Sequence, residues 1–257
     1  MQEKTSANLA VLVLSCDAYS DLWPPFFELY FKNWPDNKFD TFLLSNFNVY
    51  PDSRVETITV GEDITWSQNL INALKGLDRY EYVLLLMEDG FLKEKVDTTV
   101  LNSIIEEFTS NKGNYLTLIN EPKPNISHNK DYGEISIGAP YRPTATFAVW
   151  KINTLLSLLD VNENAWEFEK KGAIRSDKFD KFYSVHHDQF TYIHGVIKGQ
   201  WLSPAIEDLK TLGIKVSDDR GIYSNKYQVF LFIYKVVRGV IFKITPFKYR
   251  RKLIKKG

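Results

Sequence analysis

Hydrophobic and polar residues follow two different patterns along the first half of this chain. Continuous apolar runs, such as residues 82–87, are typical of strands that are buried on both faces of a sheet. Stretches such as residues 23–33 place apolar side chains at helical spacing instead. The two patterns predict strands over 7–15, 39–45, 54–60, 82–87 and 115–119, and helices over 23–33, 65–77 and 96–110. This order predicts an α/β fold with a mostly parallel sheet flanked by helices.

The second half of the chain has a less regular pattern. Residues 121–143 are rich in Pro, Asn and Gly, which favours loops or a short hairpin. The elements predicted after them are a strand over 144–150, a helix over 153–159 and a polar turn over 164–172. No internal repeat or low-complexity linker interrupts the pattern, so we expect one large domain over residues 1–219 and a tail over residues 220–257.

The formal net charge of zero hides an uneven distribution of charge. Of the 32 basic residues, 11 lie from Arg220 onward, where there is no Asp or Glu. The rest of the chain therefore carries 21 basic and all 32 acidic residues, a net charge of −11. An acidic body with a basic tail indicates a separate role for the tail.

The basic tail is also rich in aromatic and aliphatic residues, especially over residues 227–243. A basic amphipathic helix with this composition can lie in the interface of a membrane and favours anionic lipids. The alternative is that residues 227–242 pack on the domain and that only the terminal residues are free. We expect the first arrangement, because 11 uncompensated cations exceed what packing requires.

The compartment follows from cysteine usage and from the length of the apolar runs. The single cysteine, Cys16, excludes an internal disulfide and fits a reducing environment. The apolar run over residues 9–14 is too short for a signal peptide. No segment reaches the roughly 20 apolar residues that a membrane-spanning helix needs. We therefore expect a cytoplasmic protein that is peripheral on the inner face of the cell membrane.

Two adjacent carboxylates, Glu88 and Asp89, come directly after the most apolar predicted strand. In an open α/β sheet, ligands bind at the carboxyl ends of the strands. A carboxylate there can hold Mg²⁺ or Mn²⁺, which in turn neutralises a diphosphate. The alternative is a solvated turn in which Asp89 caps the next segment.

Two motifs around this acidic pair resemble a known family. WSQN at residues 66–69 lies in the predicted helix before the strand, and the strand and its acidic end read YVLLLMEDGF over residues 82–91. A tryptophan-led helix before a strand that ends in an acidic pair and an aromatic residue is similar to bacterial GT-A-type glycosyltransferases. The similar enzymes act in the biosynthesis of cell-surface polysaccharides such as capsule and lipopolysaccharide.

The resemblance implies a GT-A-like, Rossmann-like domain that binds a nucleotide-sugar donor, for which UDP is the commonest nucleotide. It implies that Asp89 is the principal ligand of a divalent metal and that Glu88 contacts the donor sugar or ribose. The residues expected at the donor site are Ser15, Asp17, Tyr19, Trp66, Asn69, Glu88 and Asp89.

A second candidate cluster is the segment WEFE at residues 166–169. An inverting transferase needs one carboxylate as general base beside the acceptor hydroxyl and a surface on which the acceptor sugar stacks. Either Glu167 or Glu169 can supply the base, with a preference for Glu169, and Trp166 is the expected acceptor contact. The alternative is a capping turn with exposed charges beside a core tryptophan.

A third cluster contains histidines, at His186, His187 and, further along, His194. In GT-A enzymes a late histidine can complete the metal shell, and we select His187 for this role. A zinc site is not expected, because no cysteine partners exist and adjacent histidines diverge on regular structure.

These observations favour an enzyme, a metal-assisted, hexosyltransferase-like glycosyltransferase that acts on a glycan or lipid-linked acceptor. A nucleotidyltransferase is the second candidate, but residues 15–21 lack the glycine and the basic residue of its phosphate loop. A non-catalytic membrane-surface module is the third candidate. Nucleic acid is not an expected partner, because phosphate binding needs widely spread cations and the body is acidic.

Overall fold

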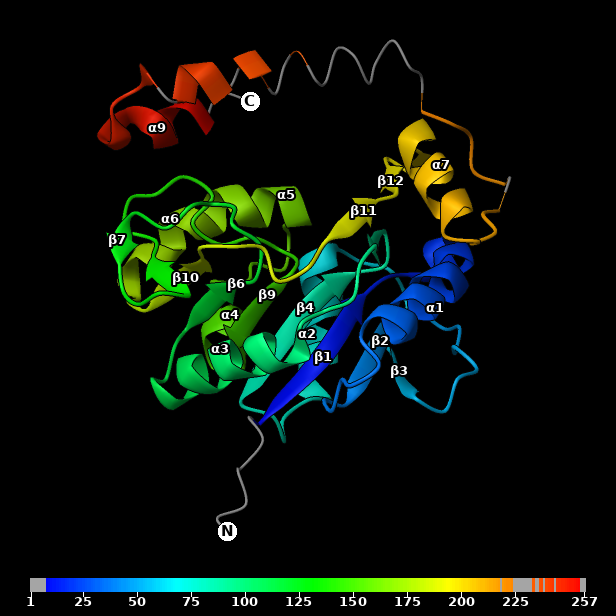
Figure 1. Ribbon diagram of the computed structural model, residues 1–257. Helices are drawn as coiled ribbons and strands as arrows, with labels where there is room; N and C mark the ends of the chain where they lie inside the picture. Colours follow the sequence, from blue (N-terminus) through cyan, green and yellow to red (C-terminus); the bar gives the residue numbers. More distant parts are fainter. Residues whose placement is uncertain are drawn as a thin grey trace.

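A nine-stranded sheet forms the centre of the protein in the computed structural model (Figure 1). The structure describes residues 8–217, 219–223, 233, 236–237, 239–242 and 244–254. In the order in which they lie side by side, the strands are β3 (Val55–Thr59), β2 (Thr41–Ser45), β1 (Leu9–Leu14), β4 (Tyr82–Met87), β9 (Ala148–Lys151), β6 (Tyr115–Thr117), β10 (Phe182–Val185), β8 (Tyr132–Glu134) and β7 (Ile126–Ser127).

Most strands of this sheet run in one direction. The neighbours β3, β2, β1 and β4 are all parallel, and β10 is parallel to β6. Only β9 and β8 run the other way, because each is antiparallel to both of its neighbours. The predicted α/β fold with a mostly parallel sheet is therefore confirmed.

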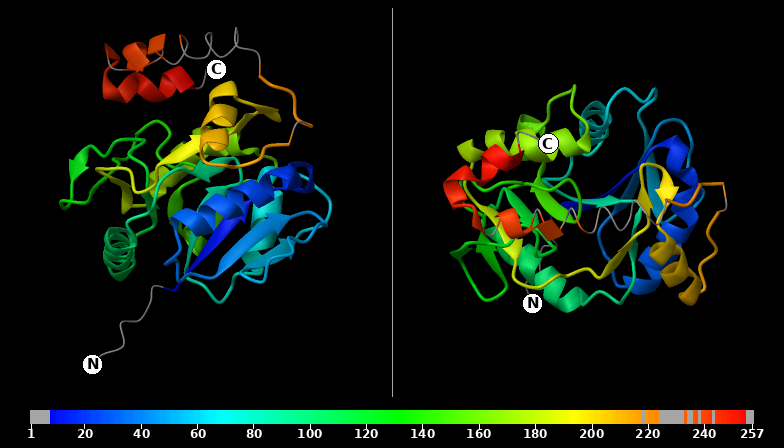
Figure 2. Two further views of the ribbon diagram at one scale, coloured as in Figure 1. Left: turned by 45° about the vertical axis from the view of Figure 1, so that its right-hand side comes forward. Right: turned by 90° about the horizontal axis from the view of Figure 1, so that it is seen from above.

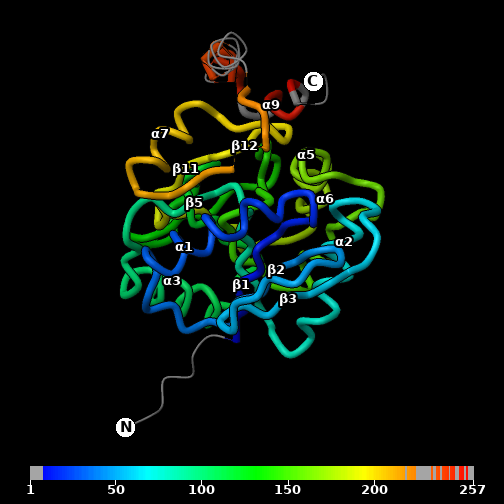
Figure 3. The backbone as a smooth tube through the Cα atoms, turned by 90° about the vertical axis from the view of Figure 1, so that its right-hand side faces the viewer, coloured from blue at the N-terminus to red at the C-terminus, as the bar shows by residue number. Residues whose placement is uncertain are grey.

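Helices cover both faces of the sheet, and each face has its own hydrophobic core. The helices are α1 (Trp23–Asn33), α2 (Trp66–Lys75), α3 (Thr98–Ser110), α4 (Ile152–Leu158), α5 (Ala165–Glu167), α6 (Ala173–Arg175), α7 (Ser203–Thr211) and α9 (Phe247–Ile254). Side chains of α1, α3 and α7 join one cluster, and those of α2 and α4 join the other. Figure 3 shows α1 and α3 on one side of the strands and α2 on the other.

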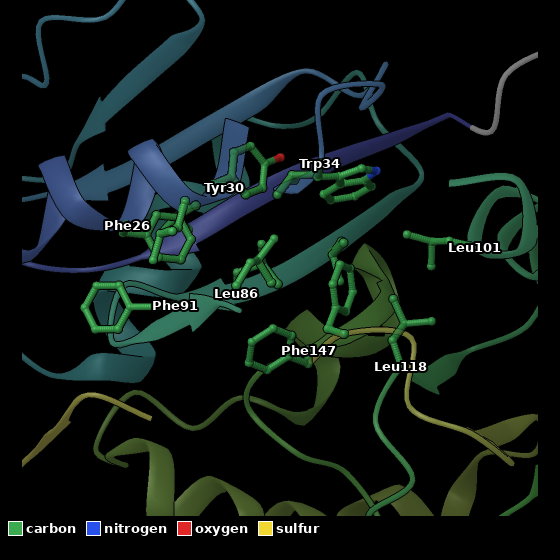
Figure 4. Close-up of a cluster of buried hydrophobic side chains, with 14 of the residues drawn as sticks. Phe26, Tyr30, Trp34, Leu86, Phe91, Leu101, Leu118 and Phe147 are labelled. Atoms are coloured by element: carbon green, nitrogen blue, oxygen red, sulfur yellow. The ribbon is translucent and has the colours of Figure 1, made fainter. Parts of the chain in front are cut away.

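The core between the sheet, α1 and α3 is largely aromatic (Figure 4). Phe26 and Tyr30 of α1 stack with a centroid separation of 5.8 Å, and the Trp34 ring lies 5.7 Å from Tyr30. Burial of such rings removes a large apolar area from water, which fixes α1 against β1 and β4. The abundance of aromatic residues in this part of the chain is thus explained by packing.

Two short ribbons bring late segments of the chain to the end of β4. β5 (Gly90–Leu92) follows β4 after a turn and pairs antiparallel with β11 (Tyr192–His194). β12 (Val196–Ile197) and β13 (Gln200–Trp201) then form a small hairpin. Figure 2 shows that these late segments and α7 lie at the end of the molecule opposite to the N-terminus.

The predicted elements of the first half are all present, with ends shifted by a few residues. Two predictions for the second half need correction. The strand predicted over 144–150 begins only at Ala148, since Phe147 has a φ of 50° that breaks the extended chain. The polar turn predicted over 164–172 is helical, because Asn164 and Glu167 form a capping box that starts α5.

The predicted amphipathic helix of the tail lies largely outside the described residues. Those that are described at 233, 236–237, 239–242 and 244 are helical, and α9 follows. Within the part of the chain that the structure describes, no helix is both long enough and apolar enough to cross a bilayer.

Candidate active site

The carboxyl ends of β1 and β4 lie side by side in the sheet. The two strands are parallel, with Leu14 opposite Met87. The residues that follow, 15–17 after β1 and 88–89 after β4, therefore meet at one edge, as the predicted order of strands indicates. This edge holds most of the polar residues that the sequence singles out.

Glu88 is buried at this edge, with only 5% of its surface exposed. Burial, and then the charge of Asp89, raise the pKa of Glu88 well above 4.5. Arg220 and a hydrogen bond with Ser15 act in the opposite direction. A buried carboxylate beside a second carboxylate marks a place where a cationic group of a ligand, or a metal ion, would be favourable.

Asp89 faces a histidine that comes from a distant part of the chain. Its Oδ2 lies 3.2 Å from Nε2 of His194, and its carbonyl accepts a hydrogen bond of 2.8 Å from Gly195. The pairing of β5 with β11 places His194 opposite Gly90. A Cβ at Gly90 would lie 3.0 Å from the ring of Phe147, so the glycine lets this ring pack against the turn.

The sequence selects His187 as a metal ligand, but the histidine that lies beside Asp89 is His194. His187 is exposed in the loop after β10, and its carbonyl accepts a hydrogen bond from Gln189. Its neighbour His186 bonds the carbonyl of Asn129 instead. Among the described residues, no three His, Cys, Asp or Glu side chains are grouped so that they could hold a metal ion.

Arg220 also lies at this edge, where its charge acts on Glu88. It donates two hydrogen bonds, of 2.7 and 2.5 Å, to the carboxylate of Asp21 and one to the carbonyl of Ala18. Its guanidinium lies 4.2 Å above the ring of Tyr19. Sequence reasoning counted Arg220 only as the first cation of the tail and missed its role at the edge. No sequence signal pairs it with Asp21, because the two residues are 199 positions apart.

Tyr19 and Ser15 lie at the edge, as predicted for donor contacts. Burial, and then the charge of Glu88, raise the pKa of Tyr19, while Arg220 lowers it. The hydroxyl of Ser15 accepts a hydrogen bond of 2.7 Å from the indole of Trp23, which fixes it beside Glu88. Cys16 lies between them, and burial followed by the charges of Glu88 and Asp63 raises its pKa.

Asp17 has a structural role at the edge. Its carboxylate accepts hydrogen bonds from the backbone N–H groups of Asn46, Phe47 and Asn48, at distances of 3.0 to 3.3 Å. Its own N–H donates to the side chain of Asn46. Through these hydrogen bonds Asp17 joins the ends of β1 and β2 and shapes the edge, and its contact with a donor stays a prediction.

Trp66 and Asn69 support the edge from α2. The ring of Trp66 packs against Phe168 with a centroid separation of 5.5 Å, so it belongs to the core more than to a binding surface. Asn69 donates a hydrogen bond of 2.6 Å to Asp63, whose charge reaches Cys16. Asp63 is therefore the exposed side chain that Asn69 holds in place, and no sequence motif pointed to it.

The structure distinguishes the two glutamates of the second cluster. Glu167 closes the capping box with Asn164 and pairs with Lys171 at 3.2 Å, and these hydrogen bonds lower its pKa. Glu169 accepts one hydrogen bond of 2.9 Å, from the N–H of Ala145, while burial raises its pKa. The preference for Glu169 as the candidate base is consistent with this difference.

Charge interactions that involve Glu121 and Tyr192 relate Glu169 to the acidic pair. The charge of Glu121 raises the pKa of Glu169, after burial, and acts on Tyr192 as well. The charge of Asp89 also acts on Tyr192. Trp166, on α5 just before Glu169, has 72% of its surface exposed and is free to contact a ligand.

Comparison with known proteins gives a match in structure only. No protein-family model matches the chain, and no curated protein matches it. The crystal structure of S. aureus TarS 1-349 in complex with UDP is similar, with a TM-score of 0.51 and 10% identity over 79% of this chain and 62% of that one. A further S. aureus TarS structure gives a TM-score of 0.46 and 10% identity over 79% of this chain and 38% of that one.

This chain spans less than two thirds of the TarS chains that it resembles. At this level of identity the likeness concerns the fold alone. The sheet with helices on both faces agrees with that likeness. The fold of this chain is GT-A-like.

Proposed function

We propose that this protein is a glycosyltransferase that moves a sugar from a nucleotide-sugar donor to an acceptor hydroxyl. The observation that carries the proposal is the buried Glu88 beside the half-buried Asp89 at the carboxyl end of β4, near His194 and Arg220. The GT-A-like fold supports it, as does the UDP bound in the similar TarS structure, which favours a UDP-linked donor.

The donor diphosphate would lie between Asp89 and Arg220. Asp89 and His194 are oxygen and nitrogen ligands 3.2 Å apart, which fits a divalent ion such as Mn²⁺ or Mg²⁺ if the diphosphate and water complete its shell. Such an ion supplies charge neutralisation of the leaving diphosphate. Arg220, held in place by Asp21, adds a fixed positive charge on the other side.

The acceptor would bind on the side of Glu169 and Trp166. In a single displacement, the acceptor oxygen forms a bond to the anomeric carbon while the bond from that carbon to the nucleoside diphosphate breaks. The acceptor proton moves to the Glu169 carboxylate, whose raised pKa makes it a stronger base than an ordinary glutamate. Trp166 offers an exposed ring on which an acceptor sugar can stack.

The finer features of the proposal concern the sugar and the acceptor. We infer a hexose as the transferred sugar and a glycan or lipid-linked acceptor of a surface-polysaccharide pathway. A lipid-linked acceptor requires a protein on the inner face of the membrane, and the basic tail supplies a surface for this contact.

The single cysteine offers a direct test of donor binding, because Cys16 lies beside Glu88. We expect UDP with Mn²⁺ to slow the alkylation of Cys16 by a small maleimide at least about fivefold, since a bound ligand excludes the reagent. The Asp89→Asn variant should lose this protection. The matched control is Glu94→Gln, which removes an exposed carboxylate from the loop after β5.

The proposal is wrong if a folded wild-type protein shows the same rate of alkylation with and without every nucleotide diphosphate and nucleotide-sugar in the set. Release of UDP from UDP-hexoses, measured in the same samples, then identifies the donor sugar. Loss of this release in Asp89→Asn, with the melting temperature kept, supports the assignment of Asp89.

A further inference from the structure

The described residues after Tyr223 include a row of exposed aliphatic side chains. Its members are β-branched, helical and between 42% and 75% exposed, and they are Ile233, Val236, Val237, Val240, Ile241 and Ile244. Their spacing of three and four residues places them on one face of a helix. We refer to these six residues as the aliphatic stripe.

An exposed row of this kind indicates a binding surface. Soluble proteins rarely expose contiguous apolar patches, and those that they do expose are commonly interaction sites. Single exposed apolar residues occur elsewhere, as at Val100, Ile126 and Ile137, but they lie on α3, β7 and a loop, far apart in the sequence. The aliphatic stripe differs because six such residues repeat along one helical face.

The charge around the stripe identifies the partner. Residues 220–257 carry 11 basic residues and no acidic ones, so the stripe lies within a strongly cationic segment. Aliphatic residues on one face with cations around them match the interface of an anionic bilayer, where acyl chains meet phosphate headgroups. A protein groove that accepts an aliphatic face does not require this excess of positive charge.

The segment that carries the stripe is fastened to the domain at both ends. Before it, Arg220 is bound by Asp21 and by the carbonyl of Ala18. After it, Arg251 on α9 pairs with Asp177 and donates hydrogen bonds of 3.0 and 2.6 Å to the carbonyls of Ala139 and Ala173. Described residues on both sides of the stripe therefore contact the domain.

These two attachments place the segment at the end of the molecule where the candidate active site opens. Arg220 lies at the edge itself. Arg251 donates a hydrogen bond to the carbonyl of Ala173, which is the first residue of α6. Figures 1 and 2 show α9 next to α6, at the end to which β1 runs from the N-terminus. A membrane that binds the stripe would face this end.

We propose that the aliphatic stripe docks on an anionic lipid bilayer and that its two arginine attachments turn the acceptor side of the site toward the lipid. This deepens the proposed function, on which it rests for the identity of that site. It specifies an acceptor that is presented from the membrane plane instead of from solution.

The first experiment is sedimentation of the full chain with vesicles. The probes are vesicles of phosphatidylcholine alone and vesicles with about one third phosphatidylglycerol. We expect binding to the anionic vesicles, and a loss of at least about tenfold in the triple variant Ile233→Ser, Val240→Ser and Ile244→Ser. The matched control is the triple variant Val100→Ser, Ile126→Ser and Ile137→Ser, which should bind like the wild type.

The outcomes separate this inference from the proposed function. Absence of binding to anionic vesicles, or equal binding by the stripe variant, overturns the membrane surface. Another outcome is a stripe variant that binds vesicles normally but has a different molecular mass from the wild type in light scattering. This result would show that the stripe joins two copies of the chain, and it too would overturn the membrane surface. Protection of Cys16 by UDP is measured in the same variants and should be unchanged, because the stripe does not contribute to the donor site.

The orientation has its own test in the reactivity of Cys16. Anionic vesicles without nucleotide should slow the reaction of Cys16 with a bulky polymer-linked maleimide, because the bilayer faces the edge. The double variant Asp177→Asn and Arg251→Gln should keep vesicle binding but lose most of this shielding. Equal reactivity with and without vesicles, in wild-type protein that is fully bound, overturns the orientation.

Discussion

Two charged regions of this protein differ in how their charges are complemented. In the arginine cage, formed by Arg142, Arg251 and Asp177, the guanidiniums are bound by backbone carbonyls and by one carboxylate. At the acidic edge, formed by Glu88, Asp89, His194 and Arg220, a buried carboxylate lies beside a second one, and the cation is already paired with Asp21.

The difference separates buried charges that hydrogen bonds complete from a buried carboxylate that lies beside a like charge. Arg142 is fully buried, yet the carbonyls of Ile135, Ser176 and Phe179 accept its hydrogen bonds, and the Phe182 ring lies 4.3 Å from its guanidinium. Glu88 is almost as buried but has an excess of negative charge around it. Burial alone does not indicate function, whereas burial without complementary charge does.

The largest expected effect comes from breaking the arginine cage. Arg142→Met leaves three buried carbonyls without their donor, and we expect a loss of about 3 kcal/mol or more in the free energy of unfolding. Urea denaturation of the full chain measures it. Lys130→Met, which removes an exposed cation from a nearby loop, should change the free energy of unfolding by less than about 0.5 kcal/mol. An Arg142→Met protein as stable as the control would contradict the structural role of the cage.

The second prediction compares two glutamates that are close in the chain. Glu169 is buried, whereas Glu167 is paired with Lys171. Burial raises the pKa of Glu169 above 4.5, so the folded state holds its proton more tightly than the unfolded state does. The wild type therefore loses stability as the pH rises from about 4.5 through the raised pKa of Glu169. Glu169→Gln avoids this loss and should melt about 2–4 °C higher at pH 8, but not at pH 4.

The same variant should lose transfer activity, because glutamine cannot accept the acceptor proton. Glu167→Gln serves as the matched control: glutamine can also form the capping box, so we expect nearly normal activity and no pH-dependent gain in melting temperature. Thermal melts and product formation at several pH values measure both. Full activity of Glu169→Gln would exclude Glu169 as the base.

The smallest expected effect comes from a comparison of His194, which lies at the acidic edge, with His187, which lies outside it. His194→Asn removes the nitrogen 3.2 Å from Asp89, and we expect Mn²⁺-dependent protection of Cys16 by UDP to weaken about three- to tenfold. His187→Asn should leave this protection unchanged. A titration of Mn²⁺ at constant UDP measures the difference, and equal curves for the two variants would remove His194 from the site.

The sequence predicts the part of the site that depends on parallel strands. The apolar runs that become β1 and β4 are long enough to be identified, and their register brings Ser15 next to Glu88. His194 was not selected, because β5 and β11 have three residues each, too few for a periodic pattern. Short-strand pairing between distant segments is decided by packing, here by Phe147 against Gly90.

Side-chain roles were harder to predict than positions. Asp17 and Trp66 lie where the motif places them. Backbone N–H groups bind the carboxylate of Asp17, however, and the ring of Phe168 packs against Trp66. Nothing in a single sequence tells an aspartate that caps a loop from one that contacts a ligand. Arg220 was missed for a related reason, since its partner Asp21 is 199 residues away.

That separation has a consequence for the synthesis of the protein. The acidic pair leaves the ribosome long before His194 and Arg220, so a nascent chain has the carboxylates without their cationic neighbours. Domains generally fold as units during synthesis, and contacts between distant residues form late. A partly made chain would therefore lack the complete acidic edge, which can form only after Arg220 has been synthesised and has paired with Asp21.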